Sequence, residues 1–210
     1  MKKNERSRVY LATAFTEPIR DPLWNHIYLP PELARLTETA PFQQLARIKQ
    51  LGPTYLVYPG ATHTRLNHSL GVFDIARRMI EHLLAQPEAP EVTLEGVKAF
   101  LSASLLHDLG HFPYTHSLKG LPLTEHEELT GRVVLESELA PVLRNSLGTD
   151  PELVAAIVDD SFAHTNGEEL QLYRRLLSGS LDPDKLDYLN RDAYFCGVPY
   201  GIQDIDYVLS

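Results

Sequence analysis

The sequence predicts a mainly α-helical fold with a small β-ribbon near the N-terminus. Along several long segments the apolar residues recur every three or four positions, which is the spacing of an amphipathic helix. Two short segments closer to the N-terminus alternate instead between side-chain types, as strands do. The chain has 210 residues, of which 43% are hydrophobic and 22% charged, and this suits a single globular domain over residues 1–210.

The two strand-like segments are residues 24–29 and 54–58, and they can pair as the small ribbon. Between them, Pro31 and Pro41 each stand where a short helix is expected to begin, because proline is tolerated in the first helical turn. Residues 1–18 are expected to be an N-terminal extension of the domain.

The longest helical pattern covers residues 67–84, where Leu70, Phe73 and Ile80 fall on one side of the expected helix. A second pattern covers residues 93–109. Further helices are expected at residues 124–135, 151–158, 167–177 and 182–194, the first with Thr124 as its N-cap and Glu127 as the capping-box partner. With the two short helices these make roughly eight, so a functional site is expected between packed helices.

Charge is unevenly distributed along the chain, whose net charge is −9. Residues 1–60 contain 8 Lys and Arg against 5 Asp and Glu, whereas residues 61–210 contain 11 against 23. This acidic majority argues against binding to long nucleic acid, which needs a basic surface. A small polyanionic substrate is not excluded, because a bound cation can invert the local field.

Two further features bear on the cellular setting. The sequence has no run of about 18 apolar residues, the length that a membrane helix needs, so no membrane partner is expected. Cys196 is the only cysteine, which excludes a disulfide within the chain and indicates a reducing cytoplasm.

Histidines are crowded in one part of the chain, since seven of the nine lie between residues 63 and 126. Four metal-binding side chains stand where helices are expected to begin or end: His68, His107, Asp108 and Asp184. Imidazole and carboxylate together suit a borderline or hard divalent cation. Helix ends can converge on one point, so these four residues are candidate ligands.

Each candidate ligand also has a plainer interpretation. His68, near a helix start, suits a cap or a surface residue, and Asp184, in a first helical turn, suits complementation of the helix dipole. The pair His107-Asp108 is harder to explain in this way, because leucines flank it and a buried carboxylate needs a strong partner such as a cation.

Several short motifs stand along the chain: TRLNHSLGV at 64–72, HDLGHFPYTH at 107–116, DPDKLDY at 182–188, PFQQL at 41–45, KQLG at 49–52 and the pair Arg191-Asp192. Together they resemble the HD-domain deoxynucleoside triphosphate triphosphohydrolases. The resemblance runs from about Ile19 to Gly201, nearly the whole chain, and implies an HD-domain helical bundle. Each motif alone is weak, but several in the right order make chance similarity improbable.

The resemblance implies a role for each group of residues. One divalent ion (Mn, Fe, Zn, Mg, Ni or Co) would be bound by His68, His107, Asp108 and Asp184. The cleft beside it would be lined by His111, His116 and His126, which can shuttle protons near neutral pH. A substrate phosphate would be held by Arg65 and Lys185. The sugar would be contacted by Gln50, Tyr188 and Asp192, with Leu51 as a further substrate-binding residue.

The last of these motifs is also informative without the resemblance. Asp184, Tyr188, Arg191 and Asp192 fall at i, i+4, i+7 and i+8 and are expected to share one polar helical face, with Lys185 beside it. A solvated face with ion pairs is the alternative explanation.

The sequence departs from the family pattern in two places. Three residues after His116, where these enzymes usually carry an acidic residue, stands Lys119, and Glu125 or Glu127 is a candidate to replace that acid. The sequence ends at Ser210, and the helices with which larger enzymes complete the nucleotide pocket have no counterpart in it.

The resemblance implies hydrolysis of a dNTP to a deoxynucleoside and triphosphate. Two alternatives stay open. One is a phosphomonoesterase or phosphodiesterase acting on monophosphates, signalling nucleotides or short oligonucleotides. The other is a nucleotide-binding module with little catalytic activity. Relatives often assemble, so a homo-oligomer is also left open.

Overall fold

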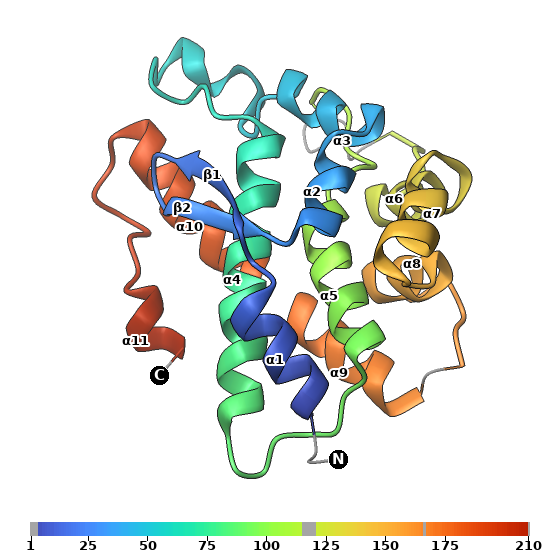
Figure 1. Cartoon of the computed structure of the whole chain (residues 1–210). Helices are drawn as coiled ribbons and strands as arrows, with labels where there is room; N and C mark the ends of the chain where they lie inside the picture. Colours follow the sequence, from blue (N-terminus) through green and yellow to red (C-terminus); the bar gives the residue numbers. More distant parts are fainter. Residues whose placement is uncertain (1–3, 115–120, 166, 210) are drawn as a thin grey trace.

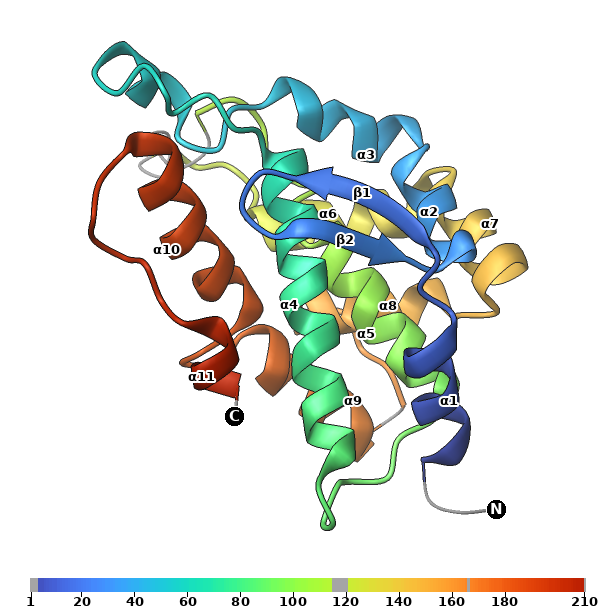
Figure 2. The same ribbon diagram turned by 60° about the vertical axis from the view of Figure 1, so that its left-hand side comes forward.

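The structure, a computed structural model, describes residues 4–114, 121–165 and 167–209, and helices dominate it (Figure 1). The long helices α4 (Arg65–Ala85) and α5 (Leu94–Leu106) pack side by side in the centre. Helix α10 (Pro183–Cys196) packs on the free side of α4, and α8 (Pro151–Val158) packs on α5 (Figure 2). The predicted mainly α fold is therefore confirmed.

The remaining elements surround this central group. They are the helices α1 (Glu5–Thr13), α2 (Pro31–Thr37), α3 (Ala40–Gln44), α6 (His126–Glu136), α7 (Leu139–Val142), α9 (Gly167–Leu177) and α11 (Ile205–Leu209), the 3-10 turns η1 (Leu45–Arg47) and η2 (Gly52–Leu56), and the π-helical turn η4 (Leu143–Leu147). The observed bounds of α8 and α9 match the prediction. Among the described helices, none combines the length and apolarity needed to span a bilayer.

The small β-ribbon pairs β1 (Glu17–Asp21) with β2 (Asn25–Leu29) in antiparallel register, Glu17 opposite Leu29. The turn between the strands is closed by the carboxylate of Asp21, which accepts hydrogen bonds from the N–H groups of Leu23 and Trp24 at 2.9 and 2.8 Å. A ribbon near the N-terminus was predicted, and β2 was predicted within it.

The predicted partner of β2 is wrong, because residues 54–58 belong mostly to η2 and the turn that follows it. Strand β2 pairs instead with β1, which lies one tight turn upstream. Closing this short loop costs less conformational entropy than closing the longer loop to residues 54–58 would. The alternation in residues 54–58 does not mark a strand with one buried face. Leu56 and Val57 are 73% and 76% exposed, so this apolar stretch covers no core.

Helix capping follows the sequence in some places and departs from it in others. Asp182 caps α10, accepting from the N–H of Lys185 at 2.7 Å. The predicted cap of α6 is wrong: the helix begins at His126, and its N-cap is Glu125, not Thr124. The extended backbone of Glu125 moves the helix start, and a capping box forms instead at α4 between Thr64 and Asn67.

Helix α1 lies within the predicted N-terminal extension and packs on α4 and α5 (Figure 2). Leu11 on this helix is buried in the hydrophobic core, together with residues of α4 and α5 such as Phe73 and Phe100. Asn4 ties its start to the loop before α5, donating to the carbonyl oxygen of Pro90 and accepting from the N–H of Val92.

The contact between α4 and α10 depends on a glycine. A Cβ atom added at Gly71 would lie 1.9 Å from Oδ1 of Asp187 and 2.5 Å from Nη2 of Arg191. Neither side chain can withdraw, because both are buried and hydrogen-bonded to each other at 2.8 and 2.9 Å. Gly71 therefore allows two charged side chains of α10 to approach the α4 backbone.

We predict that Gly71→Ala destabilises the protein by about 1–3 kcal/mol, the usual cost of overpacking. Glycine to alanine within a helix ordinarily stabilises by about 1 kcal/mol, so the sign of the effect is diagnostic. The measurement is urea unfolding followed by circular dichroism. The control is Gly167→Ala at the start of α9, where an added Cβ has no atom within 4 Å. Equal stability of the two variants would contradict the prediction.

Candidate functional site

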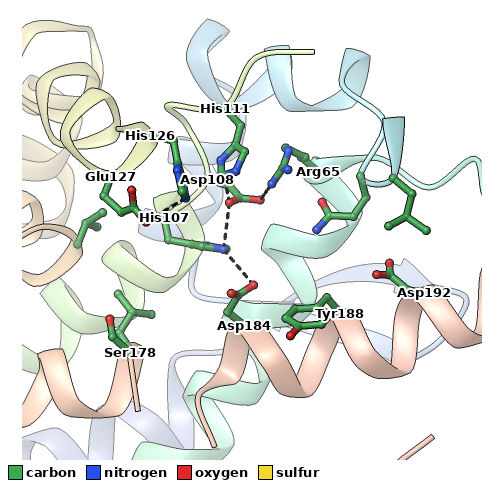
Figure 3. Close-up of a pocket in the computed structure, with 14 residues that line it drawn as sticks. Arg65, His107, Asp108, His111, His126, Glu127, Ser178, Asp184, Tyr188 and Asp192 are labelled. Carbon is green, nitrogen blue, oxygen red and sulfur yellow. Dashed lines mark hydrogen bonds and ion pairs between the residues drawn. The ribbon is translucent and has the colours of Figure 1, made fainter. Parts of the chain in front are cut away.

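Four predicted metal ligands converge at one point between three helices. Figure 3 shows three of them, His107, Asp108 and Asp184, pointing toward one another. His68 lies in the first turns of α4, the pair His107-Asp108 directly follows α5, and Asp184 lies in the first turn of α10. The sequence placed these side chains at helix ends, and packing of α4 against both α5 and α10 brings those ends together.

The distances within this group suit a single metal ion. Nε2 of His68 lies 2.8 Å from Oδ1 of Asp184 and 3.8 Å from Oδ2 of Asp108. Nε2 of His107 lies 3.4 Å from Oδ1 of Asp108 and 3.8 Å from Oδ1 of Asp184. One ligand atom from each of His68, His107 and Asp184 lies within 4.8 Å of the others. Two imidazoles and two carboxylates are a common donor set for a divalent transition metal.

The imidazole of His107 is held in the orientation that a metal ligand needs. Its Nδ1 donates to the carbonyl oxygen of Ser104 at 2.9 Å, so a ring that loses its second proton on binding a metal ion presents its lone pair on Nε2. This Nε2 atom is buried and has no hydrogen-bond partner among the described residues, although it faces the two carboxylates. A buried ring nitrogen that faces two carboxylates without a hydrogen bond to either fits a metal ligand.

The imidazole of His68 is oriented by a carboxylate that the sequence analysis did not assign. Its Nδ1 lies 2.8 Å from Oδ2 of Asp187, on the side of the ring away from Asp184. A ligating histidine whose other nitrogen bonds a carboxylate is a recurrent feature of metal sites, because the carboxylate fixes the ring and raises its basicity.

The electrostatics of the site favour a cation. Burial alone would lower the pKa of His68, but hydrogen bonds to Asp184 and Asp187, together with the charge of Asp108, raise that pKa to about 10. Burial would raise the pKa of Asp108, but the charges of His107 and Arg65 outweigh it and hold the pKa well below its usual range. The carboxylates are therefore ionised. A metal ion would compete with the proton of His68 for them.

Asp187 belongs to a buried network that runs away from the cavity. Its carboxylate accepts from Nε1 of Trp24 at 2.5 Å and from Nε and Nη2 of Arg191 at 2.8 and 2.9 Å. Arg191 also donates from Nη1 to Oδ2 of Asp21 at 2.9 Å. The network thus connects the candidate ligand His68 to the turn of the β-ribbon.

The prediction that Arg191 shares the polar face of Asp184, Tyr188 and Asp192 is wrong. Its side chain is fully buried on the side of α10 that faces Asp187 and Asp21. The spacing of Asp187 and Arg191, four residues apart on one helix, was the available signal for this ion pair.

A cavity of about 420 Å³ opens beside the candidate ligands. Most of the predicted site residues line it. The lining residues are Gln50, Leu51, Arg65, His107, Asp108, His111, His126, Glu127, Val158, Leu177, Ser178, Asp184, Tyr188 and Asp192. Val158, Leu177 and Ser178 were not predicted, and nothing in their sequence context marked them.

One predicted phosphate-binding residue is not brought to this cavity. Lys185 is absent from the lining, and its Nζ donates to the carbonyl oxygen of Gly179 at 2.9 Å and to Oδ2 of Asp182 at 2.6 Å. Its ammonium group therefore stabilises the loop that leads into α10.

The cavity carries imidazoles beside the ligands. The rings of His111 and His126 lie 4.0 Å apart between centroids. Nδ1 of His111 is 3.1 Å from Oδ1 of Asp108, and Nε2 of His126 is 3.1 Å from Oε1 of Glu127. The third predicted cleft histidine, His116, lies outside the described residues, as does Lys119.

Arg65 places a guanidinium group beside Asp108, at the end of the cavity where the candidate ligands lie. Its Nη1 donates to Oδ2 of Asp108 at 2.7 Å, and its side chain is almost fully buried. A buried guanidinium next to the candidate ligands can stabilise negative charge on a phosphoryl group.

Comparison with known proteins places the chain in a family. The sequence model of the HD domain family matches residues 65–191, more than half of the chain, and this range spans all four candidate ligands. The chain belongs to the HD domain family. HD domains bind divalent metal ions, and His68, His107 and Asp184 form a cluster that can hold one.

Curated relatives share most of the chain. The uncharacterized protein YwfO of Bacillus subtilis is 38% identical over 193 residues, which cover 90% of this chain and 42% of that protein. The human deoxynucleoside triphosphate triphosphohydrolase SAMHD1 is 32% identical over 209 residues, which cover 86% of this chain and 33% of the human protein. The chain spans less than half the length of these relatives.

Solved structures share the fold. A hypothetical protein from Aquifex aeolicus has a TM-score of 0.77 at 37% identity, covering 92% of this chain and 50% of its own. A phosphohydrolase from Bacteroides thetaiotaomicron has a TM-score of 0.71 at 32% identity, covering 86% of this chain and 42% of its own. The resemblance to HD-domain enzymes seen in the motifs is thus confirmed at the level of the family and the fold.

We predict that Asp108→Ala loses most of the bound metal, because one of the two carboxylates that lie within 3.8 Å of both imidazoles is removed. Metal content is measured by mass spectrometry after purification in trace-metal buffer. The control is His82→Ala, which removes an exposed histidine elsewhere on α4. Full metal occupancy in the Asp108 variant would show that Asp108 is not a ligand.

We also predict that Asp187→Asn lowers metal affinity by about 10- to 100-fold, the usual effect of removing a carboxylate behind a ligating histidine. The affinity is measured by competition with a chelator of known strength. Because Asp187 also neutralises Arg191, thermal unfolding of the metal-free variant is compared with wild type, so that a folding defect is recognised. Unchanged affinity in a folded variant would remove Asp187 from the support of His68.

Proposed function

We propose that this chain is a metal-dependent phosphohydrolase that acts on nucleotides, with dNTP hydrolysis to deoxynucleoside and triphosphate as the leading candidate. The observation that carries the proposal is the convergence of His68, His107, Asp108 and Asp184 beside a cavity that also holds Arg65 and two histidines. The family membership and the similarity to the human triphosphohydrolase support it.

The four converging residues are proposed as the metal ligands. When bound, the divalent ion supplies Lewis acidity to a phosphoryl oxygen and lowers the pKa of water. The ligand set accommodates Mn, Fe, Zn, Mg, Ni or Co, and manganese is one candidate. A cytoplasmic location and assembly into a homo-oligomer stay predictions.

The side chains around the ligands have proposed roles in hydrolysis. A water oxygen forms a bond to the α-phosphorus, and the bond from that phosphorus to the 5′ oxygen of the sugar breaks. Arg65 stabilises the charge that develops on the phosphoryl oxygens. His111 or His126, in contact with one another, supplies the proton that the departing 5′ oxygen needs. Glu127 lies within ion-pair distance of His126, so its carboxylate can take up the proton lost by the attacking water and return it to His126.

The remaining lining residues suit the nucleoside end of the substrate. Gln50, Tyr188 and Asp192 offer polar groups for a sugar, and Leu51 adds an apolar surface beside them. Lys185 and His116 keep their predicted roles only as sequence-based predictions, since the first is bonded elsewhere and the second is outside the described residues.

A second candidate is a phosphomonoesterase or phosphodiesterase that acts on other nucleotides. One observation favours it. Lys119 occupies a position where the triphosphohydrolases usually carry an acid. The same metal and histidines would serve either reaction, so products distinguish them.

The test of the proposed function is a nucleotide panel incubated with Mn, Mg, Fe or Co. The panel holds dNTPs, NTPs, monophosphates, signalling nucleotides and short oligonucleotides, and products are separated by ion-exchange chromatography. Inorganic triphosphate with a free deoxynucleoside is the expected result. Orthophosphate or shortened nucleotides would establish the second candidate. Tight nucleotide binding without hydrolysis would indicate the binding module.

We predict that Arg65→Ala lowers kcat/KM by about 100-fold, in line with the loss of one charged group that stabilises the transition state. Bound metal should stay near the wild-type level, because Arg65 contacts Asp108 without being a ligand. The control is Arg132→Ala on α6, whose guanidinium pairs with Glu128 on the surface. Loss of metal in proportion to activity would contradict the role given to Arg65.

A further inference from the structure

A buried histidine outside the assigned site contacts one wall of the cavity. Nε2 of His63 lies 2.8 Å from Oδ1 of Asp192, and the His63 side chain is fully buried whereas that of Asp192 is 25% exposed. The His63 ring also stacks on Phe195, with centroids 4.6 Å apart and planes inclined at 28°. His63 therefore lies against the last turns of α10 and behind a residue that lines the cavity.

The tautomer of His63 follows from its surroundings. Nδ1 is buried and has no hydrogen-bond partner among the described residues. A proton on Nδ1 would leave a buried donor unsatisfied and would turn the lone pair of Nε2 toward a carboxylate oxygen. The proton therefore belongs on Nε2, which donates to Oδ1 of Asp192. This bond leaves Oδ2 of Asp192 as the carboxylate oxygen available to the cavity.

Backbone hydrogen bonding holds His63 next to Gln50, another residue of the same cavity wall. The carbonyl oxygen of His63 accepts from the N–H of Gln50 at 3.0 Å, and an isolated bridge pairs Lys49 with Thr64. The segment before α4 is thus paired with the segment that carries Gln50. Gln50 also lines the cavity, and its Oε1 is a buried acceptor without a partner among the described residues.

A close approach of the backbone fixes the other side of His63. A Cβ atom added at Gly60 would lie 2.5 Å from the carbonyl oxygen of Phe195. The loop before α4 is therefore packed directly against the end of α10, and the ring of His63 is held between Phe195 and Asp192.

We propose that His63 is a positioning residue: its Nε2–H fixes the carboxylate of Asp192 so that one oxygen of that group accepts a hydrogen bond from a sugar hydroxyl of the substrate. This inference rests on the proposed nucleotide hydrolysis and extends it to a residue that does not touch the substrate. Two acceptors in one wall, on Asp192 and Gln50, suit a hydroxyl donor and not a phosphate oxygen.

The kinetic test compares a 2′-deoxynucleoside triphosphate with its 2′,3′-dideoxy analogue, which lacks the hydroxyl. His63→Leu removes the donor and should raise KM for the first substrate by about tenfold, the value of one hydrogen bond to a charged group. The KM of the dideoxy analogue, kcat and metal content should change less than about twofold. His63→Gln, whose amide N–H can reach the same oxygen, should restore most of the difference in KM between the two substrates.

Two controls accompany these variants. His164→Gln alters a second His–Asp pair, in which Nε2 of His164 lies 3.3 Å from Oδ2 of Asp150 away from the cavity lining, and it should match wild type. Asp192→Asn should lose the same discrimination as His63→Leu, and the double variant should lose no more than either single variant. If His63→Leu does not fold, Asp192→Asn combined with His63→Gln replaces it in the cycle.

A second measurement does not need turnover. Nitrogen NMR of the histidine rings in the full chain should show His63 protonated at Nε2 and bare at Nδ1, and Asp192→Ala should release this fixed tautomer. If the wild-type protein hydrolyses dNTPs and His63→Leu raises KM equally for both substrates, the inference is overturned and the proposed function stands. If no nucleotide is hydrolysed, the proposed function fails. A proton on Nδ1, or a His63 tautomer insensitive to Asp192→Ala, would then overturn the positioning role by itself.

Discussion

The buried carboxylate of Asp187 is the group on which the geometry of the site depends. It receives donors from three separate parts of the chain: the indole of Trp24 beside β2, the imidazole of His68 on α4 and the guanidinium of Arg191 on α10. An ionised carboxylate without these partners would cost several kcal/mol in the protein interior. The ribbon, α4 and α10 are therefore held in one relative position, and the ring of His68 is fixed as a consequence. This arrangement requires glycine at position 71, because the Cβ atom of any other residue would occupy the place of the Asp187 carboxylate.

Local patterns in the sequence were sufficient for those parts of the fold that local forces determine. The bounds of α8 and α9 follow from apolar spacing and from Pro151 and Gly167 at their starts. The partner of β2 depends instead on competition between residues 17–21 and residues 54–58. The alternation in residues 54–58 predicts a strand, but it does not show which of the two segments pairs with β2. The start of α6 was misplaced for a similar reason: Thr124 has the right chemistry for a cap, but the backbone of Glu125 takes that position.

The candidate site shows the same division. His68, His107, Asp108 and Asp184 were found from residue types at helix ends together with the motifs, and they do converge. Helical spacing correctly placed Tyr188 and Asp192 on the cavity wall, but it could not tell which way Arg191 turns, since that depends on Asp21 far away in the sequence. His63 carries no local signal at all, because its partner is 129 residues distant.

The two ends of the cavity have opposite chemistry, and one helix supplies a residue to each. Asp184 in the first turn of α10 lies at the end where the candidate metal ligands converge, and Asp192, two turns later, contributes an acceptor to the other end. A helix rises about 1.5 Å per residue, so the backbone positions of these two residues are about 12 Å apart along a rigid axis. Because Asp187 and Arg191 anchor the buried side of the same helix, that separation cannot drift without breaking the network. Under the proposed function, a substrate with a charged group at one end and hydroxyl groups at the other would match this fixed length, and a free phosphate would contact only one end.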